Sequence, residues 1–310
     1  MSNRNSVYNE NPAYAFFKTS FSPSLRPGFL FCVSSIFFNF FFRQYRAALL
    51  PGRVPVSNVE HPLDLKIPFV PSWVAIYLDF TTFWVRMLSF LLRQYGRRSF
   101  TVVREFTYSM GKLYAFAAEA YRKNFSTTSR PFYISRPRFF LIHLVDPHLM
   151  CIPSLHVMIV IFTYKMFAVI ARTLGEEDKL KAQIEEMKQG ALAITQAVVF
   201  VKQHSVNCIA AALYAVTCFD SSLFPQEEAE AFCSLLFGQA PDPVGPAGDA
   251  RLLTNYKVHP SASPKTRLPD SVQAEIKAHI VNLYRNFLAQ KTQAKTWEEP
   301  LLDFMRPLRQ

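Results

Sequence analysis

Long apolar segments, separated by short polar ones, recur along the first two thirds of the chain. Residues 28–42 carry no charged side chain, residues 67–92 carry two, and residues 153–171 carry a single lysine. The stretch 191–219 is interrupted by one lysine and one histidine. A helix needs about 20 mostly apolar residues to cross a bilayer. The pattern therefore predicts an all-α, polytopic membrane protein.

Six membrane helices account for these segments most economically. The third is the weakest, because Glu105, Lys112 and Glu119 interrupt it. The fourth should begin at Pro153, since proline fits the first turn of a helix. The predicted helices span about 27–46, 69–93, 103–122, from Pro153 onward, 186–201 and 204–219.

The segments on either side of residues 27–220 differ from this six-helix domain. Residues 1–26 form a polar leader without the features of a cleavable signal. Over residues 221–310 the apolar density falls, and 239–247 is rich in proline and glycine. Residues 270–290 regain helical periodicity, with one face formed by Val272, Ile276, Ile280, Leu283 and Phe287. We therefore expect a soluble tail whose amphipathic helix packs on the membrane domain or lies at the membrane surface.

The composition supports the membrane prediction. Half of the 310 residues are apolar and 18% are charged, against roughly 25% charged in soluble domains. The alternative is a large soluble protein with an extensive core. The net charge of +11 comes from basic residues that flank apolar helices, which favours anionic lipid head groups over nucleic acid as partners. The five cysteines show no Cys-x-x-Cys pair, and so they predict neither a metal site nor a disulfide framework.

Six spans would place both termini on one side of the membrane. The connections 45–67, 122–152 and 201–205 would then share the other side. The Lys and Arg counts on the two sides are similar, but without the basic residues of the motif connection they favour cytoplasmic termini. We therefore expect residues in these three connections to meet in an extracytoplasmic site.

Three short motifs occur in or beside those connections. The first runs from Lys123 through six residues to Arg130 and a proline. The second is Pro-Ser-Leu-His, which contains Ser154 and His156, and the third is Lys-Gln-His, which ends at His204. Each motif alone is weak, but their order and their matching membrane depth indicate one site.

These residue types suit the chemistry of phosphate esters. Lys123 supplies a compact positive charge, and the guanidinium of Arg130 can engage two phosphate oxygens. Ser154 adds a hydroxyl, next to the backbone N–H groups of a helix start. Histidine can act as acid or base near neutral pH. One of His156 and His204 could therefore attack phosphorus while the other protonates the departing alkoxide.

The three motifs resemble those of the type 2 phosphatidic-acid phosphatase superfamily. The third is similar to that of a branch that includes inositol-phosphorylceramide-synthase-like proteins, and the resemblance covers roughly residues 25–220. It implies a phospho-histidine mechanism without metal or cofactor, with a lipid phosphate ester as substrate. It also implies a residue assignment: His204 as nucleophile, His156 at the leaving group, and Lys123, Arg130 and Ser154 as phosphate ligands.

The third motif departs from the family pattern. Ala197 and Val198 stand where the family commonly has Ser-Arg, and Cys208 replaces the aspartate that orients the nucleophilic histidine. A thiol is a weak hydrogen-bond acceptor, and loss of an orienting acid can cost several orders of magnitude in rate. The supporting candidates for the site are Lys202, Asn207, Cys208 and Arg136.

Three functions compete. The leading hypothesis is a membrane enzyme that hydrolyses lipid phosphate esters or passes the phospho-head-group to another alcohol. The second is a catalytically degenerate relative that binds anionic lipid or a protein partner, as Ala197, Val198 and Cys208 suggest. The third is a transporter or channel, supported by the charged residues inside the predicted spans.

Overall fold

The fold is built almost entirely from helices. Most of the residues that the structure describes are helical, which confirms the predicted all-α class. The structure is a computed structural model, and it describes residues 6–50, 52–133, 137–237 and 268–309.

Each predicted membrane segment corresponds to a helix or to a pair of consecutive helices. The first segment is a continuous helical run of α2, a π-helical turn (Phe37–Phe41) and α3. The bounds are α2 (Arg26–Ile36), α3 (Phe42–Leu49), α4 (Val74–Leu78), α5 (Phe80–Tyr95), α6 (Phe100–Lys123), α8 (Leu155–Thr173), α9 (Lys181–Phe200) and α10 (Val206–Phe219).

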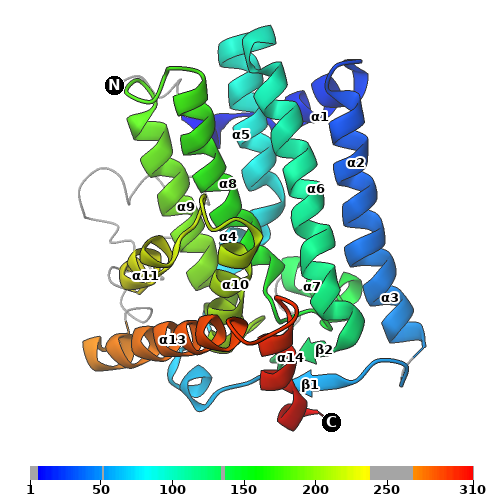
Figure 1. Ribbon diagram of the computed structural model, residues 1–310, viewed down its shortest axis with the longest axis vertical. Helices are drawn as coiled ribbons and strands as arrows, with labels where there is room; N and C mark the ends of the chain where they lie inside the picture. Colours follow the sequence, from blue (N-terminus) through cyan, green and yellow to red (C-terminus); the bar gives the residue numbers. More distant parts are fainter. Residues whose placement is uncertain (1–5, 51, 134–136, 238–267, 310) are drawn as a thin grey trace.

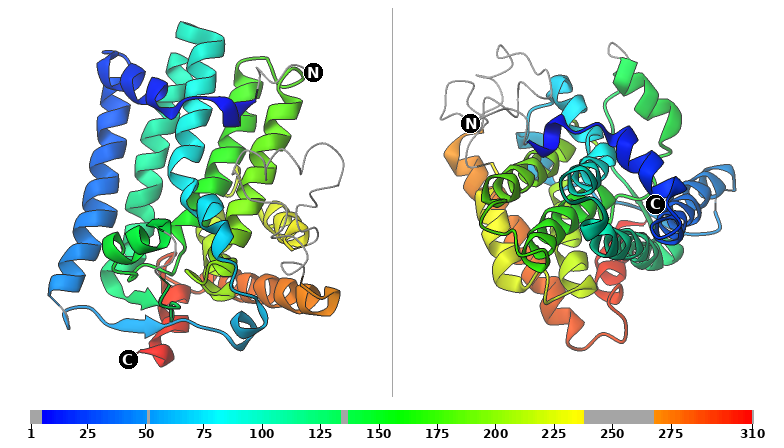
Figure 2. Two further views of the ribbon diagram at one scale, coloured as in Figure 1. Left: turned by 180° about the vertical axis from the view of Figure 1, so that it is seen from behind. Right: turned by 90° about the horizontal axis from the view of Figure 1, so that it is seen from above.

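The long helices pack side by side as an upright bundle (Figures 1 and 2). α2 lies against α6, α8 lies against α9, and α10 contacts α8. Large apolar side chains fill the interior, including Phe106 and Phe162, whose ring centroids lie 5.6 Å apart. The hydrophobic effect therefore holds together the same helices that the apolar segments predict.

Several helix starts differ from the prediction. α4 begins at Val74 rather than near 69, after a 3-10 turn at Pro71–Trp73, and α10 begins at Val206 rather than at 204, after the N-cap Ser205. α8 begins at Leu155 rather than at Pro153, because Ser154 has an extended backbone and forms the N-cap. α9 begins at Lys181 rather than near 186, because its first two turns are polar and extend the helix beyond the apolar segment.

Length and composition alone identify fewer membrane spans than six. Among the described helices, α8 is long and apolar enough to cross a membrane by itself. The number rises to three if each of two bent helix pairs is counted as one span. The structure therefore contains the six predicted helical segments, while their crossing of a membrane stays a prediction.

The leader contains a helix, α1 (Pro12–Phe21), which runs across the top of the bundle in Figure 1. Three of its phenylalanines, Phe16, Phe17 and Phe21, are exposed. The sequence analysis predicted a polar leader over residues 1–26. Its aromatic residues nevertheless form an apolar surface that continues onto α2, since Phe16 and Phe29 pack edge to face at 5.2 Å.

The tail packs against the lower end of the bundle. Its helices are α11 (Gln226–Leu235), α13 (Asp270–Lys291) and α14 (Glu299–Met305). α13 agrees closely with the predicted helix, and Ile276, Ile280 and Phe287 of the predicted face are buried. It lies across the bundle and contacts α10 (Figure 1). The Pro/Gly-rich stretch 239–247 falls outside the described residues.

Two short strands bring the connections together. β1 (Val56–Asn58) and β2 (Phe125–Thr127) pair in parallel, with Val56 opposite Phe125. Isolated bridges extend this pairing to Met150 and to Arg309. The connection after α3, the connection after α6 and the C-terminal end therefore meet at one end of the bundle.

Candidate active site

Ser154 and His156 stand at the start of α8, where the chain leaves a long loop. Ser154 is the N-cap residue, but its hydroxyl makes no capping hydrogen bond. Hydrogen bonds from the backbone N–H groups of Cys151 (3.2 Å) and Ile152 (2.7 Å) to Ser126 fix the end of the loop. The Ser154 hydroxyl is therefore available to the turn between α9 and α10.

His204 lies in that turn. The turn is sharp because Lys202 has a left-handed backbone with φ 55°, a conformation that is uncommon for a non-glycine residue. The backbone N–H of His204 donates to the carbonyl of Val198 at 3.0 Å. Ser205 then caps α10 by accepting a hydrogen bond from the N–H of Asn207 at 3.2 Å. These two hydrogen bonds fix the position from which the imidazole extends.

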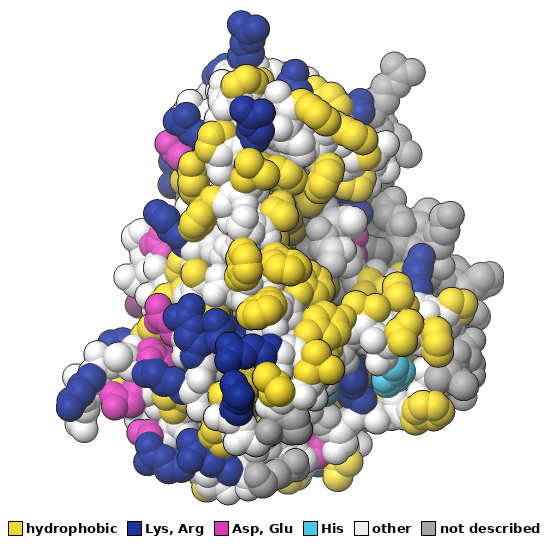
Figure 3. All heavy atoms as spheres, turned by 90° about the vertical axis from the view of Figure 1, so that its right-hand side faces the viewer, with side chains coloured by type: hydrophobic (Ala, Val, Ile, Leu, Met, Phe, Trp, Pro, Cys, Tyr) yellow, Lys and Arg dark blue, Asp and Glu magenta, His cyan; other side chains and the backbone are white. Residues whose placement is uncertain are grey.

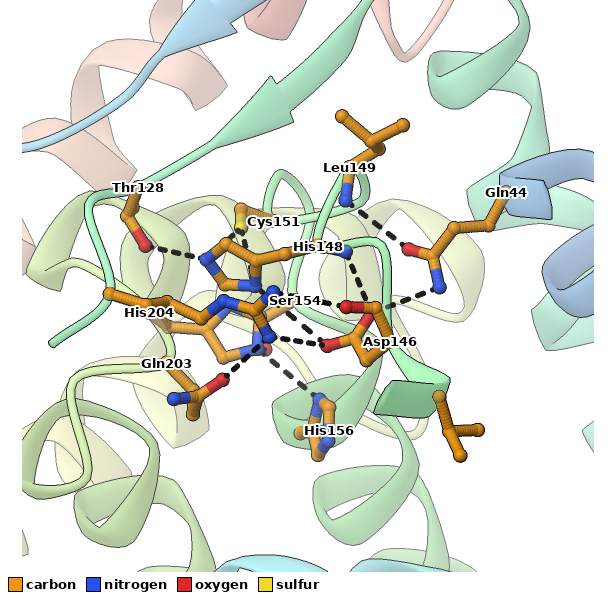
Figure 4. Close-up of polar contacts among 12 residues, drawn as sticks. Gln44, Thr128, Asp146, His148, Leu149, Cys151, Ser154, His156, Gln203 and His204 are labelled. Carbon is orange, nitrogen blue, oxygen red and sulfur yellow. Dashed lines mark hydrogen bonds and ion pairs between the residues drawn. The ribbon is translucent and has the colours of Figure 1, made fainter. Parts of the chain in front are cut away.

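The imidazoles of His156 and His204 point toward each other (Figure 4). Nδ1 of His156 lies 3.2 Å from Nε2 of His204, and the Ser154 hydroxyl lies 3.5 Å from the same nitrogen. The rings of Tyr77 and Phe80, with centroids at 4.5 and 4.0 Å, pack against the ring of His156. At this distance one of the two nitrogens donates its N–H to the lone pair of the other, and the tautomers of the two rings decide which is the donor.

Arg130 contacts the turn that carries His204. Its Nη1 donates to the side-chain oxygen of Gln203 at 3.3 Å, and its Nη2 donates to the backbone carbonyl of Asp146 at 3.0 Å. The carboxylate of Asp146 lies 3.6 Å from the guanidinium, which is half-buried. The sequence places Arg130, Ser154, His156 and His204 in one site, and the structure brings these four together at one end of the bundle.

A second polar network, centred on His148, adjoins this group. The backbone N–H of His148 donates to Asp146 at 2.9 Å, and Nδ1 lies 3.8 Å from the same carboxylate. Nε2 lies 2.8 Å from the hydroxyl of Thr128 and 3.6 Å from the sulfur of Cys151. Gln44 donates to Asp146 from α3 at 3.0 Å. The rings of His148 and His204 are 6.2 Å apart, so that the two groups form one site.

This second network carries charge. Burial would lower the pKa of His148, but Cys151 and Asp146 together raise it to about 9. Burial would raise the pKa of Asp146, but the hydrogen bonds and positive charge of His148, together with Arg130, hold it well below its usual range. At neutral pH the network therefore holds a guanidinium and an imidazolium on either side of the Asp146 carboxylate, beside His204.

Sequence reasoning missed Asp146, His148 and Cys151. They fall in an irregular loop, where no periodicity predicts which side chains meet. His148 has φ 60°, which is strained for a residue other than glycine, and such strain is concentrated at functional sites. A usable signal was the presence of three titratable residues within the six positions 146–151, directly before the second motif.

Lys123 is not part of the cluster. It is the last residue of α6, and its Nζ donates to Glu298 of the tail at 2.5 Å. Glu298 is 3% exposed, whereas the side chain of Lys123 is about half exposed. The sequence predicted that Lys123 joins Arg130 and Ser154 as a phosphate ligand. The structure corrects this prediction, because the ammonium group of Lys123 is paired with the carboxylate of Glu298.

The supporting candidates also have other partners. Lys202 donates to the backbone carbonyls of Asp64 and Ile67, on the loop that enters α4. The side chain of Asn207 donates to the carbonyl of Val59 at 3.1 Å and contacts His279 of α13 at 2.7 Å. Both residues therefore fix the surroundings of the site rather than its imidazoles. Arg136 lies outside the described residues.

Cys208 does not hold the imidazole of His204. It is fully buried. Nδ1 of His204 is buried and has no hydrogen-bond partner among the described residues. No carboxylate therefore orients the imidazole of His204 through this nitrogen in the described structure. In the described ranges, no group of three or more His, Cys, Asp or Glu side chains is placed to hold a metal ion.

Comparisons with known proteins identify no relative: no family model, no curated protein and no solved structure matches the chain. The assignment of function therefore depends on the cluster itself.

Proposed function

We propose that the protein is a multi-span membrane enzyme that transfers the phosphoryl group of a lipid phosphate ester through a phospho-histidine. The observation that carries the proposal is the facing pair of imidazoles, His156 and His204, beside Ser154 and Arg130. A paired acid and nucleophile with cationic neighbours is what phosphoester cleavage requires.

The first half of the reaction forms the phospho-enzyme. Nε2 of His204 attacks phosphorus with its lone pair, a P–N bond forms, and the P–O bond to the lipid alcohol breaks. His156, as the imidazolium, gives its Nδ1 proton to the departing alkoxide and becomes neutral, and the alkoxide leaves as the free alcohol. Arg130 and the imidazolium of His148 balance the charge on the non-bridging oxygens, and Ser154 donates its hydroxyl hydrogen to one of them.

The second half returns the enzyme to its starting state. The neutral His156 takes a proton from water, or from a lipid hydroxyl, as that oxygen attacks phosphorus. The P–N bond breaks, and its electron pair returns to His204. Water as acceptor gives a phosphatase, and a lipid hydroxyl gives a head-group transferase.

The membrane setting completes the proposal. The span-like helix α8 starts at the site, and the connections that carry the motifs meet at one end of the bundle. We infer six crossings, with cytoplasmic termini and an extracytoplasmic site. Ser154, His156 and His204 are buried, so that substrate entry requires the surrounding loops to move.

The test uses the full chain in detergent with dioctanoyl phosphatidic acid, in the presence of chelator. Phosphate release is expected, together with a phospho-enzyme that is stable to base and labile to acid. His204→Ala should abolish both signals, whereas His61→Ala, which removes a histidine stacked on His279 outside the cluster, should keep both. Equal activity of the parent and His204→Ala would refute the assignment.

A second candidate function is lipid binding without catalysis. The unpartnered Nδ1 of His204 favours it, because a nucleophilic imidazole is normally oriented through its other nitrogen. A parent protein that binds phosphatidic acid with the same affinity as His204→Ala, and releases no phosphate, would establish this function instead.

A further inference from the structure

Three arginines that belong to neither histidine network converge at the lower end of the α2–α3 run. Arg43 and Arg46 lie on one face of α3, since they are three residues apart. Arg122, in the last turn of α6, reaches the same face, and its Nη2 donates to Asn39 at 3.4 Å. Asn39 is four residues before Arg43, and it lies in the π-helical turn. Turns of this kind are frequent at functional sites.

The described structure supplies this arginine cluster with no counter-charge. Arg46 and Arg122 both act on Arg43 as like charges. Among the described residues, no carboxylate forms an ion pair with any of the three, and Nε of Arg43 is buried without a hydrogen-bond partner. Like charges held together oppose folding, and a buried donor without a partner adds to the cost. A bound anion would remove both costs, and the guanidinium fork fits phosphate oxygens in particular.

An apolar stripe runs beside the arginines on the same helix. Phe38, Phe42, Tyr45 and Leu49 follow one another at helical spacing and are exposed, and the rings of Phe38 and Phe42 lie 6.2 Å apart. Figure 3 shows this side of the molecule, where hydrophobic side chains cover the middle of the face and Lys and Arg gather near its lower end. The neighbouring stripes therefore match the two parts of a phospholipid, its phosphate and its acyl chains.

We propose that Arg43, Arg46 and Arg122 bind the phosphate group of an anionic phospholipid, whose acyl chains lie along Phe38 and Phe42. The site is separate from the histidine cluster and does not depend on catalysis there. It also adjoins that cluster through Gln44, whose side chain contacts Asp146. A lipid held here would therefore stand at the edge of the catalytic site without occupying it.

The test measures the affinity of the full chain for dioctanoyl phosphatidic acid in detergent, by native mass spectrometry. All proteins carry His204→Ala, so that the probe is not consumed and the histidine site is the same in every sample. Each arginine near an anionic lipid contributes about fivefold in affinity. Replacement of all three arginines by glutamine should therefore weaken binding about a hundredfold.

The matched control removes three charges at the other end of the helices, by Arg26→Gln, Arg97→Gln and Arg104→Gln. It should leave the affinity within about twofold, because distant sites act independently. Equal affinity loss in the two triple variants, or no loss in the first, would overturn the proposal. If the first triple variant does not fold, the single variant Arg46→Gln replaces it and should weaken binding about fivefold. An unchanged affinity of Arg46→Gln would also overturn the proposal.

Two further probes separate the sources of the phosphate. Dioctanoyl phosphatidylcholine, which has no net charge, should bind much more weakly than phosphatidic acid, and equal binding would mean that the arginines do not recognise charge. Inorganic phosphate should displace the lipid poorly, because it lacks acyl chains for the Phe38–Phe42 stripe. Efficient displacement at equal concentration would identify a site for free phosphate and refute the lipid as its occupant.

Discussion

The ion pair between Lys123 and Glu298 should anchor the tail to the bundle. The perturbation is Lys123→Met, which leaves the buried carboxylate of Glu298 without its ammonium partner. The Oε2 atom of Glu298 already has no hydrogen-bond partner in the described structure. Breaking a fully buried pair costs about 3–5 kcal/mol. Because Lys123 is about half exposed, solvent screens the interaction, and we expect a loss of about 2 kcal/mol in the free energy of unfolding.

A double-mutant cycle isolates this interaction. Glu298→Gln removes the buried charge and should cost less than Lys123→Met, because a neutral amide is easier to bury than an unpaired carboxylate. The double variant should be more stable than Lys123→Met alone. Denaturant unfolding in detergent measures the three free energies, and hydrogen exchange over α14 shows whether the tail loosens. Strictly additive effects, or a Lys123→Met protein as stable as the parent, would refute the anchoring role.

The pH dependence gives an independent check on the same pair. Burial would raise the pKa of Glu298, but the hydrogen bond from Lys123 holds it below its ordinary value. A carboxyl group with a lowered pKa contributes stability above its unfolded pKa and loses that contribution as the pH falls through its folded pKa. Tail docking should therefore weaken under acidic conditions in the parent. In Glu298→Gln that part of the pH dependence should be absent, and an unchanged acid profile would contradict the assignment.

Three more predictions concern the histidine networks. Because the pKa of His148 is raised to about 9, its positive charge is present below that pH, and the affinity for phosphate should decline as the pH rises through about 9. Asp146→Asn should move this decline toward neutral pH, and competition binding with inorganic phosphate measures the shift. His156→Ala should slow release most from substrates with poor leaving groups, and an equal effect on p-nitrophenyl phosphate would rule out its role as the acid. Cys208→Asp should give Nδ1 of His204 an acceptor one turn along α10 and raise phosphate release at least about tenfold, whereas Cys208→Asn, its control of similar size, should give a smaller gain.

The helices could be predicted because their cause is local. A run of apolar residues such as 153–171 must be buried or face lipid, and the helix is the conformation that satisfies its backbone. Helix ends were less predictable. The start of α8 depends on the backbone conformation of Ser154. The start of α9 lies among polar residues, which the position of the apolar segment does not predict. The helix ends in the structure therefore differ from the predicted ends by a few residues, although each predicted helix is present.

The site could be predicted only in the part that short motifs specify. Ser154 and His156 are fixed by a helix start, and His204 is fixed by a tight turn, so that their positions follow from local geometry. Asp146 and His148 depend instead on the conformation of a loop, including the left-handed backbone of His148. Neither hydrophobic periodicity nor motif spacing registers such a conformation. Asp146 and His148 were therefore absent from the sequence prediction, whereas Arg130 was included in it.

The partner of Lys123 shows a different limit. A lysine at the end of a helix can reach either toward the bundle axis or outward, and sequence spacing does not decide between them. Here the decision is made by Glu298, which is separated from Lys123 by 175 positions and lies in a segment that the motifs do not cover. The stacking of Trp297 on Phe116 at 3.9 Å and its hydrogen bond to Glu119 place that segment against α6. The tail thus engages Lys123 outside the histidine cluster, and through His279 it also contacts Asn207 beside that cluster.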